Sequence, residues 1–397
     1  MQEACPILHA TRTWLPKTQT WLFSQVHFQQ QFGANAHVIC ENLENVCDFS
    51  VPNIHPAPRT NSILKYVPRE LRRTLGIPNL TGGYFKVIQD LAPTVLHSHF
   101  GPVGWDHIGI TEELGTKHVV SFYGMDVGWL PTRNGAWLDR YQRLFQSACV
   151  IVCEGPFMAD CIKSLGCPRH KILVHPIGIN LDNIEFRPRR KMAGEPLRIL
   201  IASSYREKKG IPFAVMAIAG LKGRLPFEVT IIGDSAGDKE GDREKKIILQ
   251  LIDKHKLQDK VRLLGFQPYS VIFNEAYKHH IFLHPSVTSI DRDTEGGAPV
   301  VIIEMLATGM LVVATKHCDI PNIFAPPLLP LLANERDVEQ LTEILAFIDS
   351  TPEAWEPLAV AARSFVESNN SITRQTQRML SIYTKLSTHG VVDLDHI

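Results

Sequence analysis

The chain has 397 residues, in which Lys plus Arg and Asp plus Glu balance at 41 each. This length exceeds the range in which a single hydrophobic core keeps growing, so two domains are expected. Hydrophobic residues at 44% and charged residues at 21% exclude a disordered or fibrous chain. The balanced charge gives no global electrostatic reason to bind nucleic acid.

The N-terminal segment has neither a basic n-region nor a sustained apolar stretch, so we expect no signal peptide. No apolar run reaches the roughly 18 to 20 residues needed to cross a bilayer. The eight cysteines are few for this length, and several lie in apolar strand-like runs. A reduced cytoplasmic protein is the simplest interpretation of these features.

Short apolar, β-branched runs alternate with helix-patterned stretches, which predicts βαβ units and parallel sheets. In the first half the predicted strands are 35–42, 94–100, 117–124, 149–155 and 171–178. In the second half they are 197–204, 227–235, 261–266, 280–286 and 311–315. Helices are expected at 241–256 and near 371–387, where apolar residues recur at helical spacing. The predicted fold class is α/β, with two Rossmann-like parallel-sheet domains.

A segment rich in Pro, Gly and charged residues separates the two sets of strands, which predicts a linker near 185–196. We therefore expect an N-terminal domain over 1–190 and a C-terminal domain over 191–365. The remaining segment, 366–397, is expected to carry a final helix that packs back on the N-terminal domain.

The segment 59–73 is basic, with apolar residues interleaved among Arg59, Lys65, Arg69, Arg72 and Arg73. Such a segment can dock on an anionic membrane surface, which would place the protein at the inner face of the cell membrane. It can equally form a helix with a solvated basic face, and Pro68 interrupts any longer amphipathic helix. Both interpretations stay open.

The most informative stretch runs from Asp291 to Gly309 and contains a Gly-Gly pair before a predicted helix. Pro299 suits the first turn of that helix and Gly309 its end. The free N–H groups and positive dipole end of the helix would suit a diphosphate. Glu304, about two turns further on, could reach the two hydroxyls of a ribose. The alternative is a Gly-rich turn before a packing helix, with Glu304 solvated.

A basic turn with Arg206, Lys208 and Lys209 follows the predicted strand at 197–204. Cations at the carboxyl end of a parallel strand lie where open α/β sheets bind ligands. Arg206 and Lys209 could neutralise a leaving diphosphate, as a glycosyl transfer without a divalent metal requires. The alternative is a solvated basic turn.

In the N-terminal half, polar residues end two successive predicted strands. His97 and His99 alternate at the first strand end, and Tyr123 and Asp126 follow the second. Such residues suggest an acceptor site. His-x-His also occurs in metal sites, but the sequence places no third ligand. Satisfied structural histidines remain an alternative.

Taken together, these segments resemble the retaining family-4 glycosyltransferases of GT-B architecture, more narrowly the bacterial colanic-acid and exopolysaccharide type. The resemblance covers nearly the whole chain in order, through HSHFG, SFYGMDV, REKKG, IIGDS, LLGFQP and EGGAPVVIIEMLATG. The last block is quite specific, whereas His-x-His and the strands alone would be weak. The resemblance implies two domains facing a central cleft, a nucleotide-sugar donor, a glycan or lipid-linked acceptor, and no cofactor or metal.

The resemblance also implies roles for individual residues. Arg206 and Lys209 would hold the donor diphosphate, and Glu304 would bind the donor ribose. The phosphate and sugar would meet Glu295, Gly296, Gly297, Ala298, Pro299 and Val300, and the base would be bordered by Gly233, Leu264, Gly265 and Phe266. Retention by front-face attack passes the acceptor proton to a donor phosphate oxygen, so no side-chain nucleophile is demanded.

The chain departs from the family pattern at several positions. Glu295 and Glu304 are nine positions apart, where the family usually has eight. Tyr123 stands where the family usually has a histidine, so that function passes to His99 or Asp126, or is absent. Two other functions are compatible with these features: a non-catalytic nucleotide-sugar-binding module and a nucleotide-sugar epimerase.

Overall fold

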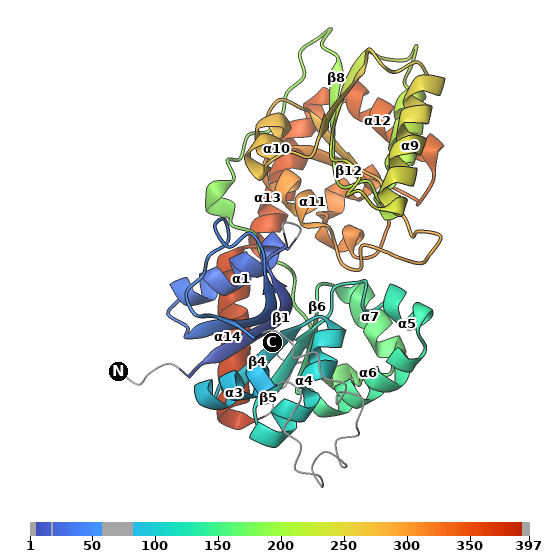
Figure 1. Ribbon diagram of the computed structural model, residues 1–397. Coiled ribbons are helices and arrows are strands. Elements are labelled where there is room, and N and C mark those ends of the chain that lie inside the picture. The colour runs from blue at the N-terminus through green and yellow to red at the C-terminus, as the bar shows by residue number, and fades with distance from the viewer. Residues whose placement is uncertain (1–4, 17–18, 58–81, 391–397) are drawn as a thin grey trace. The chain divides into compact units, whose positions relative to one another are not determined.

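The computed structural model describes residues 5–16, 19–57 and 82–390 (Figure 1), and the basic segment 59–73 lies outside them. The chain forms two compact units. Unit 1 comprises Met1–Cys153, Ala159–Gly178 and Ile372–Ile397, and unit 2 comprises Glu154–Met158 and Ile179–Ser371. The main division falls between residues 178 and 179, ahead of the boundary expected at 190.

Unit 1 is built on a parallel sheet of seven strands in the order β3-β2-β1-β4-β5-β6-β7. Its strands are β1 (Ile7–Trp14), β2 (Ala36–Leu43), β3 (Ile54–Pro56), β4 (Val95–His99), β5 (Lys117–Ser121), β6 (Val150–Cys153) and β7 (Ile172–Val174). Its helices within the described residues are α1 (Thr20–Gln31), α3 (Gly82–Leu91), α4 (Gly101–Leu114), α5 (Trp129–Arg133), α6 (Ala136–Ser147), α7 (Pro156–Ser164) and α14 (Ile372–His389). The first residues of α7, up to Met158, belong to unit 2.

Unit 2 is also built on a parallel sheet, with six strands in the order β10-β9-β8-β11-β12-β13. These strands are β8 (Leu197–Ala202), β9 (Phe227–Ile232), β10 (Val261–Gly265), β11 (Ile281–His284), β12 (Leu311–Thr315) and β13 (Leu332–Ala333). The helices are α8 (Ile211–Ala219), α9 (Lys239–Lys254), α10 (Tyr269–Ala276), α11 (Val300–Ala307), α12 (Val338–Ser350) and α13 (Trp355–Asn369). Short 3₁₀ turns join several elements, including η4 (Glu207–Lys209).

The predicted class of two parallel-sheet α/β domains is confirmed, and every predicted strand forms. Three further strands, β1, β3 and β13, were not predicted from the sequence. β1 was missed because polar His9 and Thr11 occupy buried positions of a central strand, which breaks the apolar run that marks such strands.

The final helix α14 belongs to unit 1 although unit 2 intervenes in the chain. Its buried residues Met379, Ile382 and Leu386 recur at helical spacing and pack in one cluster with residues of the central strands such as Val95 and Val119. Spacing of this kind places the apolar side chains on one face of a helix. Of the helices in the described ranges, none is both long and apolar enough to cross a bilayer.

Candidate functional site

The basic turn after β8 is fixed against the residues that follow β11. Gly210 closes the turn with φ 64°, and a Cβ there would lie 1.9 Å from the carbonyl oxygen of Pro285. Only glycine therefore fits this backbone without rearrangement. The amide of Val287 donates to the carbonyl of Lys208 at 2.9 Å. The turn consequently presents its lysines at the carboxyl ends of β8 and β11.

Lys209 pairs with Glu295 in a largely buried contact. The lysine Nζ lies 2.9 Å from Glu295 Oε1 and 2.8 Å from Oε2. The two side chains are only 17% and 6% exposed. Ser286 Oγ donates to Glu295 Oε1 at 2.8 Å, and His284 Nε2 lies 3.5 Å from the same oxygen. Burial alone would raise the pKa of Glu295, but Lys209 and His284 hold it well below its ordinary value.

The backbone of Glu295 is anchored as firmly as its side chain. Its amide is hydrogen-bonded to His317 Nε2 at 3.1 Å, and His317 Nδ1 lies 2.6 Å from Glu335 Oε1. Lys208 donates to the carbonyl of Thr294 at 3.0 Å. The segment before the glycine pair is therefore held from several sides, which preorganises the turn that follows.

The glycine pair comes directly before α11. Gly296 has φ 77°, and a Cβ on Gly297 would lie 1.7 Å from Glu154 Oε2. Pro299 immediately precedes the helix, which begins at Val300. The first N–H groups of a helix have no intrahelical partner, and they carry the positive end of its dipole. The amides of Gly296 and Gly297 already donate to Thr294 Oγ1 and to the carbonyl of Glu295, so the backbone donors of the kind that bind anions are those of the first turn of α11.

Glu304 lies on α11 and is buried, with 8% of its surface exposed. The Tyr269 hydroxyl at the start of α10 donates a hydrogen bond to its carboxylate. Burial raises the pKa of Glu304 to about 7, although the Tyr269 hydrogen bond acts in the opposite direction. The solvated glutamate that was one alternative is thus not what the structure contains.

Arg206 does not share a partner with Lys209. Its guanidinium donates to Asp238 Oδ1 at 2.9 Å and to Glu240 Oε2 at 2.8 Å, at the start of α9. Asp238 also caps that helix by accepting from the amide of Gly241 at 2.9 Å. The structure thus places Arg206 against the α9 N-terminus and Lys209 against Glu295.

The residues predicted to border a base meet at the ends of β9 and β10. The amide of Gly233 donates to the carbonyl of Gly265 at 2.8 Å. A Cβ on Gly233 would lie 1.8 Å from the carbonyl oxygen of Ser203. Leu264 is partly buried, whereas the Phe266 side chain is 58% exposed and offers an aromatic face.

In unit 1, Asp126 is fully buried and engaged at both carboxylate oxygens. Oδ2 accepts from the amide of Gly101 at 2.8 Å, and Oδ1 accepts from the amide of Tyr123 at 3.0 Å. Burial raises the pKa of Asp126 to about 6, against the lowering effect of these backbone hydrogen bonds. Asp126 therefore ties the loop after β5 to the start of α4.

His99 is also fully buried, and its two ring nitrogens contact side chains from two other segments. Nδ1 is hydrogen-bonded to the Tyr123 hydroxyl at 2.7 Å, and Nε2 to His9 Nδ1 at 3.0 Å. Tyr123 is the partly exposed member of this set. The structure thus brings His99, Tyr123 and Asp126, three of the four predicted acceptor-side residues, close together in unit 1, with Tyr123 nearest to solvent.

Several residues of these networks were not anticipated from the sequence. They are Tyr269, Ser286, His317 and Glu335 in unit 2, and His9 and Gln29 in unit 1. Ser286 is the last residue of the predicted strand 280–286, and a polar residue at a strand end is a signal that could have singled it out. Tyr269 and Glu335 come from segments distant in sequence, and only the fold brings them to their partners.

Two family models match the chain. "Glycosyltransferase Family 4" matches residues 19–183, and "Glycosyl transferases group 1" matches residues 182–364. Among curated proteins, the putative colanic acid biosynthesis glycosyltransferase WcaL of Escherichia coli (strain K12) is 31% identical over 69% of this chain and 66% of its own length. The amylovoran biosynthesis glycosyltransferase AmsK of Erwinia amylovora is 32% identical over 68% of this chain and 65% of its own length. The match thus spans about two thirds of both relatives.

Solved structures share the fold over nearly the whole chain. HepE of Anabaena, in complex with UDP and glucose, has a TM-score of 0.77 with 13% identity and covers 96% of this chain and 100% of its own. A glycosyltransferase from Rickettsia africae ESF-5 has a TM-score of 0.76 with 17% identity and covers 97% and 99%. At this level of identity the likeness concerns the fold.

Proposed function

This chain belongs to the family-4 glycosyltransferases, and from that premise we propose that it transfers a sugar from a nucleotide-sugar donor to a glycan or lipid-linked acceptor in exopolysaccharide biosynthesis. The observation that carries the proposal is the buried Lys209–Glu295 pair beside the glycine turn that opens α11. The pair holds a cation close to the N-terminal turn of α11, whose backbone N–H groups can bind the phosphates of a leaving diphosphate.

The proposed donor site lies in unit 2. The diphosphate binds at Lys209 and at the backbone from Gly296 to Val300. Arg206 also binds it, after its guanidinium releases one of its carboxylate partners. Glu304 accepts hydrogen bonds from the ribose hydroxyls, and Gly233, Leu264, Gly265 and Phe266 border the base. Glu295 orients Lys209, which is a positioning role. On the acceptor side, Tyr123 presents its hydroxyl, with His99 and Asp126 behind it.

The transfer is proposed to retain the anomeric configuration. The acceptor hydroxyl attacks the donor anomeric carbon on the face of the departing diphosphate, and its proton passes to a diphosphate oxygen. The glycosidic bond forms as the bond to the diphosphate breaks, so no covalent enzyme intermediate is required. The anomeric configuration of the product, determined by NMR with an α-configured donor, tests this step, and an inverted product would contradict it.

A transfer assay across nucleotide-sugars and oligosaccharide or lipid-linked acceptors tests the function itself. A new glycoside together with a nucleoside diphosphate is the expected outcome. Formation of the epimeric nucleotide-sugar, or of the free epimeric sugar together with the nucleoside diphosphate, without transfer to an acceptor would favour the epimerase. Donor binding without turnover across the whole panel would favour the non-catalytic module.

Phe266→Ala is expected to weaken nucleoside diphosphate binding by about 1 kcal/mol, because it removes an exposed aromatic face on which a base can stack. Phe347 on α12 is a matched control, since both phenylalanines are 58% exposed in unit 2. Titration calorimetry checks both variants. Binding that is equally weak in Phe347→Ala, or unchanged in Phe266→Ala, would remove Phe266 from the base site.

Transfer activity is expected to persist in excess chelator, because Lys209, Arg206 and the α11 N-terminus balance the charge of the leaving group. Initial rates measured promptly after adding EDTA check this expectation. Complete loss of activity that Mg²⁺ or Mn²⁺ restores would instead assign the leaving-group role to a divalent metal, with Asp291, Asp293 and Glu295 as its first candidate ligands.

A further inference from the structure

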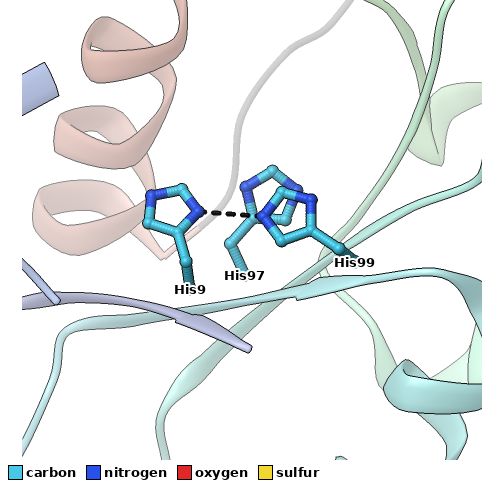
Figure 2. Close-up of side chains that lie close together, drawn as sticks. All are labelled: His9, His97 and His99. Carbon is cyan, nitrogen blue, oxygen red and sulfur yellow. Dashed lines mark hydrogen bonds between the residues drawn. The ribbon is translucent and has the colours of Figure 1, made fainter. Parts of the chain in front are cut away.

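Three histidine side chains meet in the interior of unit 1 (Figure 2). His9 on β1 and His97 on β4 are register partners on neighbouring parallel strands, and His99 follows two residues later on the same face of β4. All three are at most 1% exposed. Further along this face the sheet packs apolar residues against α14. Burying three imidazoles in such a position costs free energy unless every ring nitrogen has a hydrogen-bond or metal partner.

The ring nitrogens lie close enough together for one metal ion to bind a nitrogen from each histidine. One nitrogen from each histidine falls within 4.8 Å of the others, and His9 Nδ1 lies 3.0 Å from His99 Nε2. Zinc–nitrogen bonds of about 2.0–2.1 Å in a tetrahedral site place two imidazole nitrogens ~3.4 Å apart. His9 and His99 therefore need to separate only slightly, while His97 moves inward.

The nitrogens that face away from this centre already have partners suited to metal ligands. His9 Nε2 is hydrogen-bonded to Gln29 Oε1 at 2.8 Å. His99 Nδ1 is hydrogen-bonded to the Tyr123 hydroxyl at 2.7 Å. His97 Nε2 is hydrogen-bonded to Ser121 Oγ at 2.7 Å. Its Nδ1 is hydrogen-bonded to the Tyr383 hydroxyl, and His97 would exchange that bond for a bond to the ion. Metal-bound histidines almost always use the second nitrogen in this way, which fixes tautomer and ring orientation.

We propose that His9, His97 and His99 form a zinc-binding site inside unit 1, distinct from the donor-binding groups of unit 2. A set of imidazoles without carboxylates suits Zn²⁺ and disfavours Mg²⁺ and Ca²⁺, which prefer oxygen ligands. Burial lowers the pKa of His9 to about 4 and holds those of His97 and His99 well below the ordinary value, so the rings are in the neutral form that binds metal.

The ion would crosslink β1 to β4 at the centre of the sheet. Through the outer hydrogen bonds of its ligands it would also hold Gln29 of α1 and, by way of His99, the partly exposed Tyr123. Its role is therefore structural and positioning, and it does not contribute to departure of the diphosphate. Without an ion, the same side chains form a hydrogen-bonded chain from Tyr123 through His99 and His9 to Gln29.

Zinc content of the full chain tests the proposal. The protein is produced with zinc in the medium, passed over chelating resin and analysed by mass spectrometry, with zinc-edge X-ray absorption on the same sample. The expected result is close to one zinc ion per chain, with imidazole nitrogens as its nearest neighbours. Protein produced with Co²⁺ should show the visible bands of four-coordinate cobalt. Zinc at background level in the wild-type protein would overturn the proposal, and so would an absorption spectrum without imidazole.

Substitutions locate the ion. His9→Gln should lower the zinc affinity by more than 100-fold, and Gln29→Leu by about 10- to 100-fold, the range for partners of metal ligands. His118→Gln is the matched control, because His118 is a buried histidine of the neighbouring β5 whose Nε2 bonds Ser98 Oγ, a residue on the opposite face of β4 from His97 and His99. That variant should keep its zinc. Equal zinc content in His9→Gln and wild type would overturn the site even if another part of the chain binds zinc.

Discussion

Lys209→Ala is expected to lower kcat/KM for sugar transfer by about 10² to 10³, which corresponds to about 3 to 4 kcal/mol of lost transition-state stabilisation. The lysine Nζ is held 2.8 Å from Oε2 of the buried Glu295, which directly precedes the glycine turn. Charge on the leaving diphosphate grows as the glycosidic bond breaks, so a fixed cation there acts mainly in the transition state. Steady-state transfer kinetics at several donor concentrations check this result.

The same substitution is also expected to destabilise unit 2, because it leaves the Glu295 side chain, which is 6% exposed, without its cation. Removing one member of a buried ion pair typically costs about 3 to 5 kcal/mol. The double variant Lys209→Met, Glu295→Gln removes both charges and should recover stability without recovering turnover. Lys222→Ala is the control, since Lys222 is exposed and donates to the carbonyl of His255. Wild-type turnover in the double variant would show that Lys209 serves only to neutralise Glu295.

The strands and the glycine turn were predictable because their signals are local. An apolar β-branched run such as 311–315 predicts a buried strand from its own residues. Pro299 and Gly309 likewise predict the start and the end of α11 without information from the rest of the chain. The partners of the site residues were not predictable in this way. Arg206 and Lys209 are three residues apart, yet the first meets Asp238 and the second meets Glu295. The different partners of the two residues follow from the fold and cannot be read from the local sequence.

The histidine cluster illustrates the same limit in unit 1. His97 and His99 stand out in the sequence, but the third member comes from β1, whose polar residues concealed the strand. Parallel pairing of β1 with β4 then sets His9 opposite His97. Contacts across strands depend on sheet order and register, which a single sequence does not specify.

Glu304→Gln is expected to weaken donor binding by about 1.5 to 3 kcal/mol above neutral pH, the range for hydrogen bonds to a charged group. Hydrogen bonds from two ribose hydroxyls favour the ionised carboxylate. In the free protein burial raises the pKa of Glu304 to about 7, so much of it is protonated at neutral pH and below. Donor affinity of the wild type, relative to Glu304→Gln, should therefore rise as pH rises through about 7.

The free energy of unfolding of the wild-type protein should fall over the same pH range in which its donor affinity rises. Because the folded-state pKa lies above the ordinary value of 4.5, the contribution of Glu304 is fully present below about pH 4.5 and is lost as pH rises through about 7. A shift of this size corresponds to about 3 kcal/mol. The free energy of unfolding of Glu304→Gln should lack this decline, which thermal or urea unfolding across the range can detect.

Comparing the two proteins at each pH separates the carboxylate from the ligand, because phosphate groups of a nucleoside diphosphate titrate identically with both. The ratio of their dissociation constants should be near one at about pH 5.5 and reach about 10- to 150-fold at about pH 8.5. A 2′-deoxy nucleoside diphosphate should show a much smaller ratio at the upper end, since one of the two proposed hydrogen bonds is gone. A ratio that stays constant with pH, or that is the same for both ligands, would place the ribose away from Glu304 and leave this carboxylate as the buried partner of Tyr269.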